Sequence, residues 1–137
     1  MTYHYTYFID RALGKSLGDA LQSLGVKIEF HHDHFPPDSP DTEWLPIVSQ
    51  QGWVVLTKDD NISRNILEVE QIAHSQARVF ILVSGNLSRQ DVINIFVNAI
   101  DKIEKITQGN QAPFIAKIYR PAKVSMWLNR VQLRKHI

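Results

Sequence analysis

Cysteine is absent from the sequence, so the protein has no disulfide framework, no cysteine nucleophile and no thiolate metal site. Long apolar runs are missing too, since no stretch approaches the roughly 20 residues that cross a bilayer. The first residues, MTYHYTYFIDR, are polar where a signal peptide needs its apolar segment. No internal repeat or low-complexity stretch is present. These absences predict a soluble, cytoplasmic protein that does not act on membranes.

The length of 137 residues suits a single domain, and a hydrophobic content of 44% is enough for one continuous core. The net charge of +1 conceals an asymmetry, because residues 1–70 carry 11 acidic and 5 basic side chains. Residues 71–137 carry 3 acidic and 10 basic ones. This division is consistent with an acidic site beside a basic surface for an anionic polymer such as RNA. An accident of surface composition is the alternative interpretation.

Predicted strands alternate with predicted helices along the chain. Apolar and β-branched runs predict strands over residues 3–9, 26–30, 53–57 and 78–83, and a terminal hairpin or edge strand over 114–119 and 124–128. Apolar residues at helical spacing predict helices over 12–24, 41–52, 62–74 and 88–106. The alternation predicts an α/β fold with a mainly parallel central sheet and helices on both faces.

Two segments are predicted to lack regular structure. The three prolines of HHDHFPPDSPD predict a loop between the second strand and the following helix. Residues 129–137, NRVQLRKHI, are predicted to form a poorly ordered, basic C-terminal tail. The single domain is therefore expected to span residues 1–128.

Three aspartates lie at the ends or starts of these elements. Asp10 follows the first strand, Asp41 begins a helix, and Asp59 follows the strand WVVLT. Because parallel strand ends share one edge of a sheet, these carboxylates are expected to converge. Gathered carboxylates repel one another unless a cation lies between them, and hard oxygen ligands suit Mg²⁺ or Mn²⁺. The pattern predicts a metal-dependent site for phosphoryl transfer or phosphodiester cleavage.

Four further polar residues lie near the same predicted edge. Lys15 and Lys58 could contact phosphate oxygens as point charges, although solvated surface lysines are the more ordinary interpretation. Ser84 and Asn86 could orient a water or a 2′-hydroxyl, although turn formation and helix entry are the favoured interpretation.

The run His31-His32-Asp33-His34 raises the question of a zinc site. Along an extended chain only His32 and His34 would face the same side, and a closed site would need further ligands. A zinc site is therefore disfavoured, and Trp44 and Trp53 are expected in the core rather than as base-stacking platforms.

The strand ending in FID before RALGKSL, the helix start PDTEWL and the turn VVLTKDDNI together resemble PIN-like domains related to the VapC toxins of toxin–antitoxin systems. The resemblance covers residues 7–97 and implies a three-layer α/β/α sandwich that cleaves single-stranded RNA with Mg²⁺ or Mn²⁺. It implies catalytic and metal-binding roles for Asp10, Asp41 and Asp59, and a partner antitoxin. A homodimer is compatible with it.

A further glutamate that is typical of such domains has no clear counterpart here, and Glu43, Asp33 or Asp60 could substitute for it. Two other functions therefore stay open. One is a catalytically silent PIN-like module that binds RNA or protein. The other is a receiver-like phosphoacceptor domain built on Asp59, Ser84 and Lys117, which is disfavoured because Asp10 is followed by Arg11 and not by a second acid.

Overall fold

A computed structural model describes residues 2–58, 66–83 and 86–136. Its centre is a six-stranded sheet in the order β2-β1-β3-β4-β5-β6, in which the first five strands are parallel and β6 pairs antiparallel with β5. The strands are β1 (Thr6–Ile9), β2 (Lys27–Phe30), β3 (Val54–Thr57), β4 (Arg78–Leu82), β5 (Phe114–Tyr119) and β6 (Lys123–Leu128). The α/β fold with a mainly parallel sheet and a terminal hairpin is confirmed.

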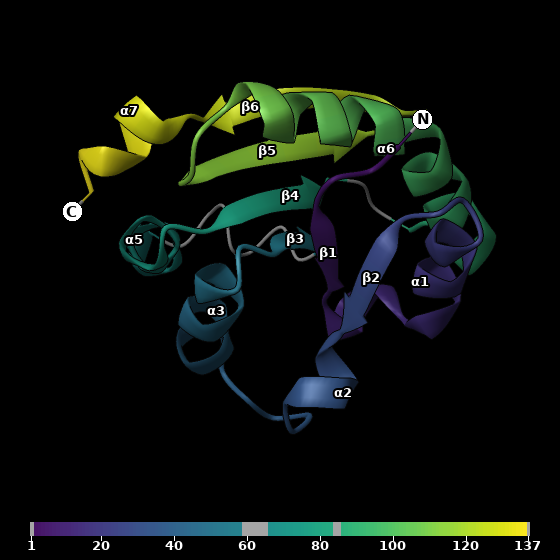
Figure 1. Ribbon diagram of the computed structural model, residues 1–137, viewed down its shortest axis with the longest axis horizontal. Coiled ribbons are helices and arrows are strands. Elements are labelled where there is room, and N and C mark those ends of the chain that lie inside the picture. Colours follow the sequence, from purple (N-terminus) through teal and green to yellow (C-terminus); the bar gives the residue numbers. More distant parts are fainter. Residues whose placement is uncertain (1, 59–65, 84–85, 137) are drawn as a thin grey trace.

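Helices cover both faces of this sheet, as Figure 1 shows. They are η1 (Arg11–Leu13), α1 (Lys15–Gln22), α2 (His31–His34), α3 (Asp41–Gln50), α5 (Ile66–Ser75), α6 (Arg89–Gly109) and α7 (Arg130–Arg134). Helices α1 and α6 pack on one face, whereas α3, α5 and α7 pack on the other. The predicted three-layer α/β/α sandwich is therefore present. In the described part of the chain, no helix is long and apolar enough to cross a membrane.

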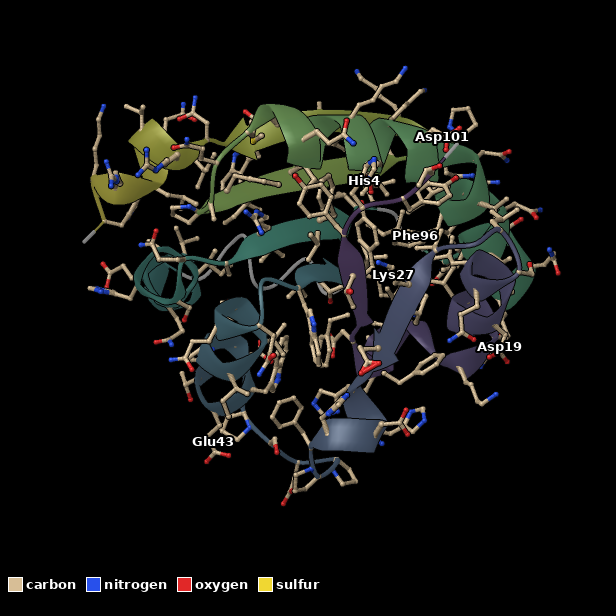
Figure 2. The ribbon with its side chains drawn as sticks, in the orientation of Figure 1. His4, Asp19, Lys27, Glu43, Phe96 and Asp101 are labelled. Atoms are coloured by element: carbon tan, nitrogen blue, oxygen red, sulfur yellow. The ribbon has the colours of Figure 1, made fainter. Side chains whose placement is uncertain are left out.

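Successive side chains along each strand point to opposite faces of the sheet, and this produces two separate hydrophobic cores. In β1, Tyr7 and Ile9 face α1 and α6, whereas Phe8 faces α3. Buried parallel strands present apolar side chains on both faces, which is why β3 is apolar up to its last residue, Thr57. Helix α6 contributes one apolar stripe, including the fully buried Phe96 labelled in Figure 2. Its Ser88 cap, expected from the sequence, forms a capping box with Asp91.

Two local predictions were wrong. The residues HHDH, expected in a loop, form the single helical turn α2, and His31 is only 3% exposed. The expected disordered tail contains α7, where Leu133 is fully buried in the core beside α5. Both helices are too short to be stable alone, so tertiary packing stabilises them, and sequence periodicity gives little signal for such helices.

The direction of the crossovers determines where a site can form. From β1 the chain passes to β2 on one side, and it returns to β3 on the other side of β1. In open parallel sheets this reversal leaves a crevice beyond the carboxyl ends of the two strands. Three residues lie there, namely Asp10 directly after β1, Thr57 at the end of β3 and Lys58 directly after it.

Gly18 lets α1 pack closely against β2. A Cβ on Gly18 would lie 2.2 Å from Cε1 of the buried Phe30 ring, whereas a Cβ on Gly109 at the end of α6 would meet nothing within 4 Å. We expect Gly18→Ala to destabilise the fold, because overpacking costs about 1–3 kcal/mol and the gain in helix propensity is at most about 1 kcal/mol. Gly109→Ala, the matched control, should stabilise by up to about 1 kcal/mol. Urea denaturation of both variants measures whether each substitution raises or lowers the free energy of unfolding. A stabilised Gly18→Ala protein would contradict this packing.

Candidate functional site

Two donors from neighbouring elements hold the carboxylate of Asp10. Its Oδ1 accepts a hydrogen bond from the backbone N–H of Arg11 at 2.7 Å, and its Oδ2 accepts one from the Thr57 hydroxyl at 2.8 Å. Thr57 is fully buried, and Ile9 pairs with Leu56, so the next residues of β1 and β3 meet at the sheet edge. A carboxylate has about four lone-pair positions, and these two bonds occupy two of them. These two bonds orient the carboxylate of Asp10.

A cavity of about 220 Å³ opens beside Asp10. Its walls come from the end of β1, the η1–α1 junction and the start of α2, and they include Arg11, Gly14 and Lys15. Gly14 has a φ of +80°, which glycine adopts without strain. The Nζ atom of Lys15 lies 3.0 Å from Asp19 Oδ2 on the exposed surface of α1, so this lysine already has a partner.

His31, the first residue of α2, lines the same cavity and packs against two aromatic side chains. Its ring centroid lies 5.5 Å from Phe35 and 5.7 Å from Trp44. Its Nδ1 is buried and has no hydrogen-bond partner among the residues that the structure describes. Burial lowers the pKa of His31 and outweighs the opposing effect of the nearby Asp10 charge. The ring is therefore neutral at pH 7.

The other histidines of this run take part in local pairs. His34 Nε2 lies 3.0 Å from Glu29 Oε1, and His32 Nε2 lies 3.4 Å from Asp33 Oδ1. The side chain of Asp33 is 59% exposed. Across residues 2–58, 66–83 and 86–136, no three acidic or histidine side chains are grouped as metal ligands.

The remaining predicted site residues fall in different places. Asp41 is the first residue of α3 and is partly buried. Glu43 is exposed, and in Figure 2 it points away from the sheet. Lys58 and Asn86 are exposed. Asp59, Asp60 and Ser84 lie outside the described residues, so the convergence of Asp10, Asp41 and Asp59 stays a prediction.

The donor chemistry at Asp10 fits a hard divalent cation. Its carboxylate is held in orientation by two hydrogen bonds from described residues and borders a cavity. Oxygen ligands of this kind bind Mg²⁺ or Mn²⁺, and a carboxylate held by outer hydrogen bonds loses little freedom when it binds an ion.

Sequence reasoning did not foresee three contributors to this region. Thr57 was noted only as the end of the strand WVVLT, yet its hydroxyl orients Asp10. Arg11 reaches the loop between α2 and α3, where its Nη1 donates to the Pro37 carbonyl at 2.7 Å. Arg89, at the start of α6, donates to the Ser16 hydroxyl at 3.1 Å. The signal for Thr57 was present, because a polar residue ends an otherwise apolar strand.

Comparisons with known proteins show which family the chain resembles. A protein-family model described as a PIN like domain matches residues 6–84, which include Asp10, Asp41 and Asp59. The chain is 24% identical over 122 residues to the putative ribonuclease VapC45 of Mycobacterium tuberculosis, a match that spans 85% of this chain and 87% of that protein. No solved structure matches the chain.

Proposed function

This chain belongs to the PIN-like domain family and is related to VapC proteins, and from that premise we propose that it is a metal-dependent endoribonuclease that cleaves single-stranded RNA. The observation that carries the proposal is the oriented carboxylate of Asp10 at the crevice between β1 and β3. The name of the relative, a putative ribonuclease, supports the same class of reaction. The cleavage of RNA would take place in the cytoplasm.

We assign Asp10, Asp41 and Asp59 as the residues that hold Mg²⁺ or Mn²⁺. When bound, such an ion lowers the pKa of a coordinated water and polarises a phosphate oxygen. The Thr57 hydroxyl keeps the carboxylate of Asp10 pointed in one direction. Arg11, next to Asp10 at the cavity wall, provides positive charge near the position that an RNA phosphate would occupy. Glu43, Asp33 and Asp60 remain the candidates for an auxiliary acid.

Cleavage of a mixed single-stranded RNA pool tests the proposal. Products should appear with Mg²⁺ or Mn²⁺ and disappear when EDTA removes the ion. Activity that persists in EDTA would contradict a metal-dependent mechanism. RNA binding without cleavage under any metal would favour the alternative of a catalytically silent binding module.

The receiver-like alternative lacks a supporting observation. The strand order β2-β1-β3-β4-β5 occurs in receiver-type domains too, so the sheet alone does not distinguish the two functions. Lys117, the lysine that such a domain would need, lies with its Nζ 4.4 Å from the centroid of the Trp127 ring. This contact is a cation–π interaction in the hairpin of β5 and β6. The family match favours the nuclease.

As a toxin, the protein would need an inhibitory partner, which we propose to be an antitoxin encoded beside it. The chemistry of the site favours a segment that places an arginine or lysine among Asp10, Asp41 and Asp59. Because cation and partner would use the same carboxylates, each should lower the affinity of the other. Titration of the complex with Mg²⁺ while partner affinity is followed measures this competition. Tight binding of the partner to an Asp10→Ala/Asp59→Ala variant would place inhibition on another surface.

A further inference from the structure

A second cavity, of about 280 Å³, adjoins the one beside Asp10 and shares Arg11 and Gly14 with it. Its remaining walls come from the end of β3 and from the start of α6. Three cationic side chains line it, namely Arg11, Lys58 and Arg89, together with apolar side chains that include Leu13, Leu87 and Val92. We call this the basic pocket. Arg89 lies beyond the residues that the family model matches.

Among the described residues, the side chains that line the basic pocket carry positive charge only. No acidic residue is found in its described lining. Within the described ranges, neither Arg11, Lys58 nor Arg89 is in a salt bridge. Lys15, only a few residues away, is by contrast paired with Asp19. Gathered cations repel one another, so an anion that enters the pocket relieves this repulsion.

Two of the three cations are held in position by neutral groups. A Cβ on Gly14 would lie 2.8 Å from Nη1 of Arg89, so the missing side chain makes room for that guanidinium group. The same nitrogen donates to the Ser16 hydroxyl at 3.1 Å, and Arg11 is tied to the Pro37 carbonyl at 2.7 Å. Side chains that are already ordered lose less conformational entropy when a ligand binds. Planar guanidinium groups also match the oxygens of a phosphate.

We propose that the basic pocket binds one phosphate of the RNA backbone next to the phosphate that is cleaved. The proposal rests on the ribonuclease function and adds a requirement to it, namely a substrate with a phosphate beyond the scissile one. The apolar wall of Leu13, Leu87 and Val92 would contact the sugar or base attached to that phosphate. Arg89 and Lys58 are then specificity-determining residues that bind substrate away from the reacting atoms.

Binding of a fluorescein-labelled RNA octamer in EDTA tests the pocket without any cleavage. The double variant Lys58→Gln/Arg89→Gln should bind about tenfold more weakly. When the logarithm of its association constant for RNA is plotted against the logarithm of the salt concentration, the slope should be shallower by about 0.7, the value for one phosphate of a single strand. The control is Lys105→Gln, because Lys105 is exposed on the same helix about 24 Å along its axis from Arg89. An equal change of slope in this control, or none in the double variant, would overturn the proposal.

Short substrates distinguish failure of the pocket from failure of the function. A dinucleotide with a 5′- or 3′-terminal phosphate should be cleaved with kcat/KM about tenfold higher than the unphosphorylated dinucleotide, and the double variant should lose this gain. Cleavage that is indifferent to both terminal phosphates would overturn the pocket and leave the ribonuclease intact. Absence of all cleavage, with the binding results as expected, would overturn the ribonuclease function and leave the basic pocket as a binding site for an RNA phosphate only. Inorganic phosphate that displaces the octamer as effectively as unlabelled RNA would assign the pocket to free phosphate instead.

Discussion

Replacement of Asp10 by asparagine is expected to reduce metal-dependent RNA cleavage by at least about 100-fold, because a bound cation loses a charged ligand. Asparagine is the appropriate replacement, since its amide oxygen can still accept from the Arg11 N–H and its amide nitrogen can donate to Thr57. The fold should therefore persist. Initial rates on a single-stranded RNA measure the effect.

Thr57→Val provides the graded comparison for this variant. It removes the hydroxyl that donates to Asp10 Oδ2 but leaves the carboxylate in place. Loss of such an outer hydrogen bond typically costs about 10–100-fold, so its effect should be smaller than that of Asp10→Asn. Melting temperatures serve as the control for folding. Wild-type rates in the Asp10→Asn protein would remove Asp10 from the mechanism.

Leu133→Ala is expected to lower the free energy of unfolding by about 2–5 kcal/mol, although Leu133 is close to the C-terminal end of the sequence. The side chain is fully buried in the core formed with α5 and the strands, so its truncation leaves a cavity. Figure 1 shows α7 beside α5 at the edge of the molecule. For a domain with a total stability of about 5–15 kcal/mol, this is a large fraction.

Val131→Ala is the matched control, because Val131 is in the same helix but is 69% exposed. Its effect should stay within about 0.5 kcal/mol. Chemical denaturation followed by tryptophan fluorescence compares the two variants. Equal stabilities of the two proteins would mean that α7 does not contribute to the core, and that residues 1–128 suffice as the folded domain.

Most of the fold could be predicted from short-range patterns. The apolar residues of β3 and the apolar stripe of α6 with its Ser88 cap are local properties, because burial on two faces or on one determines which residue types occur. The two wrong segments are short helices. His31 packs among Phe8, Phe35 and Trp44, and Leu133 packs beside α5, so both depend on partners distant in the sequence.

For the candidate site, too, one part follows from the sequence and another part only from the tertiary structure. The position of Asp10 at a strand end follows from the sequence, since a polar residue after an apolar run marks where a buried strand leaves the core. Its orientation does not, because the Thr57 hydroxyl that holds it is 47 residues away along the chain. The contact between Arg89 and Ser16 spans 73 residues. Only the crossovers that place β3 next to β1 and the start of α6 beside the η1–α1 junction bring these groups together, and no local pattern encodes such long-range contacts.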